Sequence, residues 1–104
     1  MPKKPSRLIW APKADRDLLD IWNYYAVEAS AEIADRVVGQ IVTAARRIVR
    51  LPLSGRARDD LKPGLRAVLA HPYVVFYRLA ESDVEIVRVL HERRNLPSVL
   101  AKSD

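Results

Sequence analysis

The chain has 104 residues, of which 49% are apolar and 30% are charged, with a net charge of +5 and no cysteine. This balance predicts one globular domain spanning residues 1–104 and excludes a disordered chain. The lack of cysteine excludes disulfides and thiolate metal sites, while short, charge-broken apolar runs exclude a membrane span. The N-terminal lysines precede no apolar segment long enough for a secretory signal, so we expect a cytoplasmic protein.

The positive charge is unevenly distributed along the sequence. Residues 1–45 carry six basic and six acidic side chains, whereas residues 46–104 carry twelve basic and seven acidic ones. A basic half-chain indicates a polyanionic or acidic partner, such as nucleic acid, the ribosome or an acidic protein segment. A basic surface that only keeps the protein in solution is the alternative interpretation.

The first third of the chain predicts a short strand followed by a helix. Leu8–Trp10 is a brief apolar run typical of an edge strand, and Pro12 suits a first helical position. The helix is expected over Pro12–Val27 because apolar residues recur there at helical spacing. Its apolar stripe consists of Ala14, Leu18, Ile21, Trp22 and Tyr25.

A second helix is predicted from the N-cap Ser30 to the residues before Pro52. Its apolar stripe includes Ile33, Val37, Ile41 and Ile48, and its opposite face is polar. Only a few residues separate the two helices, so they should form an antiparallel hairpin.

The second half predicts an antiparallel meander. Leu53–Gly64 lacks periodicity and is expected to be a surface loop. Runs rich in Val, Tyr and Phe then predict strands at Leu65–Ala70, Tyr73–Leu79 and Val84–Leu90, separated by short turns. The tail Leu96–Asp104 should add one helical turn that docks on the sheet through Val99 and Leu100.

Together these elements predict an α+β fold with the order β-α-α-β-β-β. The helical hairpin should pack on one face of a predominantly antiparallel sheet, since only the sheet offers a matching apolar face. The other face should be partly open and basic. The residues expected in the core are Leu18, Trp22, Val37, Ile41, Val75 and Tyr77.

The candidate chemistry of the chain lies at the end of the last strand. The sequence has no phosphate-binding loop, serine-hydrolase elbow or metalloprotease motif. With only two histidines and no cysteine, we expect no metal site and no cofactor. His91 with Arg93, Arg94 and Arg88 could supply acid–base catalysis and cations for RNA cleavage. The structural alternative is that His91 caps the strand end and the arginines form ion pairs.

The assembled blocks resemble a known family. These are D-L-x-x-I-W-x-Y (Asp17–Tyr24), L-P-L-S-G-R (Leu51–Arg56), H-P-Y-V-V-F-Y-R (His71–Arg78) and V-E-I-V-R-V-L-H-E-R-R-N (Val84–Asn95). In this order they are similar to the ParE branch of the RelE/ParE toxin superfamily of bacterial type II toxin–antitoxin, or plasmid stabilisation, modules. The resemblance covers about Leu8 to Leu100.

The superfamily resemblance implies two alternative activities. ParE-like toxins are associated with poisoning DNA gyrase, and our first interpretation is a gyrase poison without chemistry of its own. RelE-like toxins cleave mRNA on the ribosome, an alternative in which His91 and Arg93 are the catalytic groups. Val74 stands where RelE-like strands keep an arginine, and the family's C-terminal catalytic tyrosine has no counterpart here. A relative that has lost toxicity and only binds an antitoxin is the third interpretation.

The same resemblance implies the partners. A ParD-like antitoxin with an acidic, amphipathic C-terminal segment should wrap the toxin in a hetero-oligomer. We predict that it meets four arginines, Arg46, Arg47, Arg56 and Arg58. The target, DNA gyrase, is predicted to contact Arg88, His91, Arg93 and Arg94.

Overall fold

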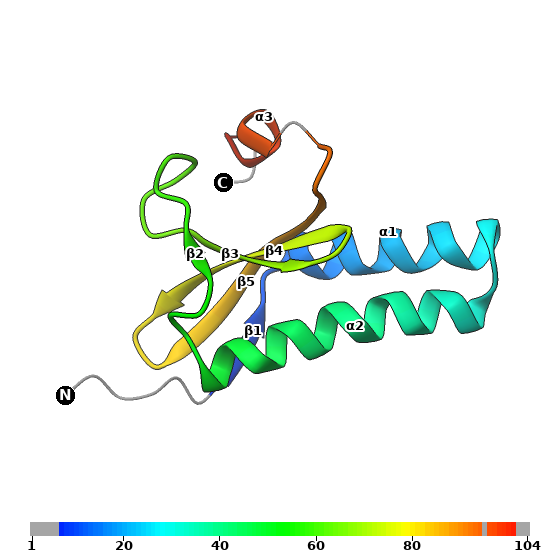
Figure 1. Cartoon of the computed structure of the whole chain (residues 1–104), viewed down its shortest axis with the longest axis horizontal. Helices are drawn as coiled ribbons and strands as arrows, with labels where there is room; N and C mark the ends of the chain where they lie inside the picture. Colours follow the sequence, from blue (N-terminus) through cyan, green and yellow to red (C-terminus); the bar gives the residue numbers. More distant parts are fainter. Residues whose placement is uncertain (1–6, 95, 102–104) are drawn as a thin grey trace.

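The computed structural model describes residues 7–94 and 96–101 (Figure 1). The elements in chain order are β1 (Arg7–Trp10), α1 (Pro12–Glu28), α2 (Ala31–Arg50), β2 (Arg56–Ala57), β3 (Arg66–Ala70), β4 (Tyr73–Ala80), β5 (Asp83–His91) and α3 (Leu96–Ala101). The predicted α+β class is confirmed, as are both long helices and the three-strand meander. Among the described residues, no helix is long and apolar enough to cross a membrane.

The strands form one mixed sheet in the order β1-β5-β4-β3-β2. The pairs β3–β4 and β4–β5 are antiparallel, as predicted. The pair β2–β3 is antiparallel as well, whereas β1 pairs with β5 in parallel. The helical hairpin carries the chain from β1 to β2 at the far edge of the sheet. The chain then reverses direction at each step from β2 to β5, and β5 returns beside β1 in the same direction as β1. Arg7 and Asp83 join the two strands at 3.0 Å between Nη2 and Oδ2.

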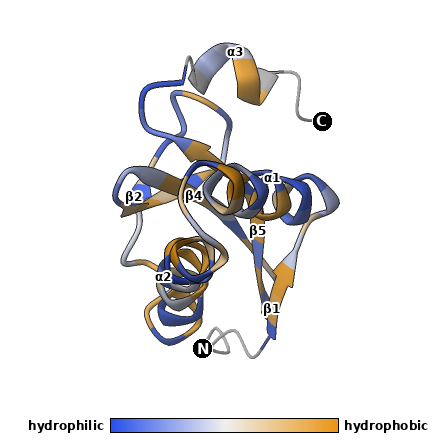
Figure 2. Cartoon of the chain, turned by 90° about the vertical axis from the view of Figure 1, so that its right-hand side faces the viewer, coloured by the Kyte–Doolittle hydropathy of each residue, from blue (hydrophilic) through white to orange (hydrophobic). Residues whose placement is uncertain are grey.

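Local sequence signals explain where the helices begin. Pro12 opens α1, and the side chain of Ser30 accepts a hydrogen bond of 3.1 Å from the backbone N–H of Ile33 at the start of α2. Hydrophobic and hydrophilic residues occupy different sides of α2 (Figure 2). The two helices pack side by side as the predicted hairpin (Figure 1).

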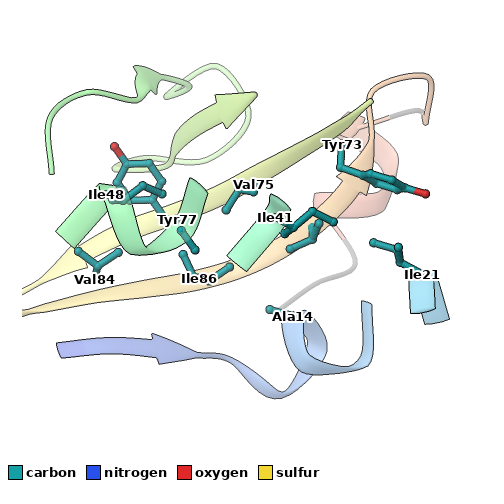
Figure 3. Packing of buried hydrophobic residues seen from close by; sticks show 11 residues of the cluster. Ala14, Ile21, Ile41, Ile48, Tyr73, Val75, Tyr77, Val84 and Ile86 are labelled. Atoms are coloured by element: carbon teal, nitrogen blue, oxygen red, sulfur yellow. The ribbon is translucent and has the colours of Figure 1, made fainter. Parts of the chain in front are cut away.

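The main core lies between this hairpin and one face of the sheet (Figure 3). Ile41, Val75 and Tyr77 are buried as predicted, and Leu18 and Val37 are half-buried against the same cluster. Trp22, predicted with them, is half-buried too, and its Nε1–H donates to Oδ1 of Asp35 at 2.8 Å.

A second, smaller core covers part of the opposite sheet face. Leu100 of α3 is buried with Leu65, Phe76 and Leu90, which confirms that the C-terminal turn docks on the sheet. The face predicted to be open is therefore partly covered by α3. Residues 102–104 of the predicted tail lie outside the described residues.

The segment predicted as a loop contains the two-residue strand β2. Arg56 and Ala57 pair with Ala67 and Arg66 of β3, so the loop prediction was wrong for this pair. Two residues cannot display an alternating pattern, which explains why the sequence gave no strand signal.

Candidate protein-binding surfaces

Asp17 of α1 anchors Arg88 of β5. The Arg88 Nε donates to Oδ2 of Asp17 at 2.8 Å, and its Nη2 donates to Oδ1 at 2.9 Å. The side chains of Arg88 and Asp17 are only 14% and 12% exposed, and the hydrogen bond with Asp17 raises the pKa of Arg88. The Asp17 Oδ2 also accepts from the backbone N–H of Val89 at 2.9 Å. A helix side chain thus takes the place of a neighbouring strand where β1 no longer covers β5.

This ion pair separates Arg88 from the other residues predicted to bind the target. Its guanidinium faces Asp17, whereas Arg93 and Arg94 are exposed in the turn that follows β5. The role of Arg88 in target binding stays a prediction, and its place in the structure is that of a positioning residue for β5.

His91 is fixed at the end of β5 by its surroundings. Its Nδ1 accepts a hydrogen bond of 3.1 Å from the backbone N–H of Arg93, and its carbonyl accepts one of 3.0 Å from that of Arg94. The accepting Nδ1 assigns the neutral imidazole proton to Nε2. The ring lies edge-on to Tyr73, with 5.5 Å between ring centroids. His91 therefore caps the end of β5 through hydrogen bonds to the backbone, as in the structural alternative.

A shallow cleft of 220 Å³ lies beside this strand end. Its lining includes Asp20, Tyr24, Tyr73, His91 and Arg94. The Tyr73 hydroxyl donates to the Tyr25 hydroxyl oxygen at 3.3 Å. Burial, followed by this hydrogen bond, raises the pKa of Tyr73 well above its usual range. The cleft therefore combines aromatic side chains with an exposed arginine.

The raised pKa of Tyr73 predicts a specific loss of stability in alkali. Folded Tyr73 keeps its proton above pH ~10, where an unfolded tyrosine loses it, so the stability is complete below that pH and falls above it. Urea unfolding at about pH 8 and 11 should show a smaller fall for Tyr73→Phe than for the wild type. The exposed neighbour Tyr24, changed to Phe, is the matched control and should keep the wild-type fall. Equal falls for all three proteins would contradict the prediction.

A groove of 520 Å³ runs between α2 and the turn that joins β3 to β4. The α2 wall consists of Arg36, Gly39, Gln40, Thr43, Ala44 and Arg47. Ala70 and His71 form the opposite wall. Gly39 has open space around the position where a Cβ would stand, so the small residues leave room for a partner chain. The polar residues of α2 predict that this face is exposed to solvent. Gly39 is the one feature of the α2 sequence that could have indicated a groove.

The four arginines predicted to meet an antitoxin have different surroundings. Arg47 lines the groove, and Arg46 is exposed beside it on α2. Arg56 is exposed on β2, whereas Arg58 binds Asp60 through two hydrogen bonds of 3.0 Å. That contact raises the pKa of Arg58 and lowers the pKa of the Asp60 carboxyl.

The sheet edge next to the groove is open at one end of β3. Within residues 7–94 and 96–101, β2 pairs only with Arg66 and Ala67, so no strand pairs with the remainder of β3 on the side away from β4. Leu69 lies in this uncovered stretch with 61% of its surface exposed. An exposed apolar residue on an unpaired edge is a template for strand addition.

Taken together, the surfaces define a class of protein. Residues 7–94 and 96–101 contain no group of three or more His, Cys, Asp or Glu residues suited to hold a metal. They instead present a basic groove, an open sheet edge and a cationic strand end. Such surfaces on a small α+β domain are suited to contacts with other macromolecules.

Comparison with known proteins specifies this class. The chain matches the family model for the ParE toxin of the type II toxin–antitoxin system parDE over residues 8–96. It is 33% identical over 96 residues to toxin ParE3 of Caulobacter vibrioides, covering 92% of this chain and 96% of that protein. It is 32% identical over 92 residues to toxin ParE1 of Mycobacterium tuberculosis, covering 88% of this chain and 94% of that protein.

A solved structure agrees with the sequence relatives. The chain superposes on a structure of the chromosomal ParDE toxin–antitoxin system from P. aeruginosa with a TM-score of 0.74 and 26% identity. The match covers 85% of this chain and 96% of that one. This chain belongs to the ParE toxin family of type II toxin–antitoxin systems. The predicted family is confirmed, and the relatives support its ParE branch rather than RelE-like mRNA cleavage.

Proposed function

We propose that this toxin inhibits DNA gyrase by binding it, without catalysing a reaction of its own. The observation that carries the proposal is membership of the ParE family over nearly the whole chain. The geometry of the strand end supports it, because the Nδ1 of His91 is occupied by the Arg93 backbone N–H. Cleavage of RNA needs one group to remove a proton and another to supply one, and this histidine presents only its Nε2.

The exposed cations after β5 are the proposed contact with the target. Arg93 and Arg94 are held on a turn whose backbone is tied to His91, so their position is defined by the sheet. Cations on a rigid strand end can grip an acidic or phosphate-bearing surface with little loss of conformational entropy. Arg88 contributes indirectly, since its ion pair with Asp17 fixes β5.

The groove beside α2 is the proposed docking site of a ParD-like antitoxin in a hetero-oligomer. An acidic, amphipathic segment would place its carboxylates near Arg36 and Arg47 and add a strand at the open edge around Leu69. Arg46 lies on α2, Arg56 on β2 and Arg58 directly after β2, and these three arginines would steer the approach of the acidic segment. Such a segment would fold as it binds.

Two assays on one preparation test the gyrase proposal. The purified chain should block gyrase supercoiling, or trap cleaved DNA, while ribosome-bound mRNA stays intact. Arg93→Ala with Arg94→Ala should weaken inhibition about tenfold, which corresponds to about 1.4 kcal/mol of binding energy. His91→Ala alone should have a smaller effect. Arg16→Ala with Arg50→Ala removes the same charge from exposed positions elsewhere and is the matched control.

The opposite pattern would overturn the proposal. Cleaved message with unaffected gyrase, abolished by His91→Ala, would establish a ribonuclease. Equal weakening by the control double variant would show that net charge, rather than the strand end, drives inhibition.

A further inference from the structure

Tyr24, the last residue of the D-L-x-x-I-W-x-Y block, lies on the surface of α1. It is 59% exposed, and among the large apolar residues exposed in residues 7–94 and 96–101 it is the one aromatic. The main core uses its neighbour Tyr25 instead. Exposed tyrosine rings are typical anchors of protein interfaces, because they supply a large contact area with few rotatable bonds.

Four aromatic rings connect Tyr24 with the end of β5. Tyr24 packs edge-to-face on Tyr25, with 5.1 Å between the ring centroids. The Tyr25 hydroxyl accepts a hydrogen bond from Tyr73, and the Tyr73 ring lies edge-on to His91. Because each ring restrains the next, Tyr24 is oriented before a partner arrives, and binding loses little conformational entropy.

The cleft of 220 Å³ joins this row of rings to the strand end. Its apolar lining consists of Ile21, Tyr24, Val89 and Leu90. Pockets that enclose a whole small-molecule ligand have volumes of about 300–1,000 Å³. The smaller volume of this cleft therefore suits one apolar side chain of a protein partner, the kind of contact that dominates binding energy at interfaces.

The polar residues of the cleft favour a protein segment over a nucleic acid. Asp17 and Asp20 line it, and each already forms an ion pair with an arginine. Arg94 adds one exposed cation, and His91 offers the proton on its Nε2. These donors suit one carboxylate of a protein, whereas a nucleic acid is bound by cations that follow its phosphate backbone.

We propose that DNA gyrase anchors in this cleft, with an apolar side chain of a gyrase segment packed on the Tyr24 ring and a neighbouring carboxylate bound by Arg94 and His91. The inference rests on the proposed function and deepens it, because it adds a surface of α1 to the contact at the strand end. Gyrase is the favoured occupant, since Arg94 and His91 belong both to the cleft and to that contact. The described residues that line the α2 groove are all different from those of the cleft, which keeps the antitoxin site distinct.

Removal of the Tyr24 ring tests this anchor. Tyr24→Ala should raise the toxin concentration that half-inhibits supercoiling by the gyrase holoenzyme at least about tenfold, as loss of a central aromatic anchor does. Tyr24→Phe keeps the ring and should stay within about twofold of wild type. Val27→Ala is the matched control, because it truncates an apolar side chain that is 81% exposed on the same helix outside the cleft lining. It should also stay within about twofold of wild type.

A second substitution and a second measurement separate binding from folding. Tyr24→Gln removes the ring with a residue of good helix propensity and should give the same loss of inhibition as Tyr24→Ala. Both variants should bind the cognate full-length antitoxin with a Kd within about twofold of the wild-type value, measured by calorimetric titration. Normal antitoxin binding shows that the variants are folded.

Four results would overturn the inference. If both ring-free variants inhibit gyrase like Val27→Ala, the cleft makes no contact with the target. If they inhibit gyrase normally but lose antitoxin binding, the cleft belongs to the antitoxin. If both activities fall together, Tyr24 supports the fold rather than a contact. If the wild-type chain leaves supercoiling unaffected, the proposed function itself fails, an outcome that the wild-type assay identifies before any variant is compared.

Discussion

Replacing Asp17 with Ala is expected to lower the free energy of unfolding by about 3 kcal/mol, near the low end of the range for breaking a buried ion pair. The substitution leaves the Arg88 guanidinium largely buried without its carboxylate partner. It also removes the acceptor of the Val89 backbone N–H on the uncovered edge of β5. Urea unfolding followed by circular dichroism measures the loss, with the m-value showing whether unfolding remains two-state.

Two further variants separate the cost of leaving Arg88 unpaired from the cost of losing a carboxylate or the Val89 hydrogen bond. Asp20→Ala removes a carboxylate of the same helix that pairs with Arg16 at 3.5 Å on the surface, and should cost at most about 0.5 kcal/mol. Asp17→Leu with Arg88→Met removes both charges and should cost less than Asp17→Ala alone, because no buried charge is then left unpaired. A double variant as unstable as Asp17→Ala would contradict the electrostatic explanation and assign the cost to the Val89 hydrogen bond.

The periodic segments of the chain could be predicted because each signal was local. The apolar stripe around Ile41 predicts α2, and the continuous apolar run Tyr73–Tyr77 is typical of a central strand that is largely buried, as β4 is. Ser30, Pro12 and Pro52 marked helix boundaries through backbone chemistry that depends on a few neighbouring residues. Family motifs then connected these elements to the ParE fold.

Features that depend on distant residues could not be predicted in the same way. Asp17 lies in the N-terminal part of α1, where a carboxylate is favourable for the helix dipole on local grounds alone, yet its partner Arg88 lies 71 positions further along the chain. Trp22 shares the helical spacing of the core residues, but spacing alone does not reveal its hydrogen bond to Asp35 of α2. The parallel pairing of β1 with β5 is set by the path of the whole hairpin.

The candidate site was predicted in part. The strand end with His91, Arg93 and Arg94 was located from the polar cluster that follows an apolar run. The groove arises only when α2 is placed beside the turn after β3, and the edge at Leu69 is open only because β2 pairs with two residues of β3. Neither arrangement leaves a local signal in the sequence. The role of Gly55 in the L-P-L-S-G-R block also depends on a distant residue, because Gly55 packs against the ring of Tyr77.

Gly55→Ala is expected to destabilise the fold by about 2–4 kcal/mol, from overpacking and lost hydrogen bonds. A Cβ at this position would lie 2.6 Å from Cε1 and 2.9 Å from Cζ of Tyr77, whose ring is fully buried and cannot move aside freely. The Tyr77 hydroxyl accepts from the Gly55 N–H at 2.9 Å and donates to the Pro52 carbonyl at 2.8 Å. Displacing the ring would break both bonds, which hold the turn after α2 against β4.

Gly39→Ala is the matched control, because it makes the same chemical change where no atom lies within 4 Å of the new Cβ. Gly39 stands in the interior of α2, so alanine should raise stability by about 0.5–1 kcal/mol through helix propensity. Thermal melts of the two variants should therefore shift in opposite directions. Tyr77→Phe removes the hydroxyl and both hydrogen bonds while leaving the ring in place, so it measures their share of the cost. A Gly55→Ala protein that melts at the wild-type temperature would show that the turn relaxes around the new methyl group, and that the clamp between Gly55 and Tyr77 does not stabilise the fold.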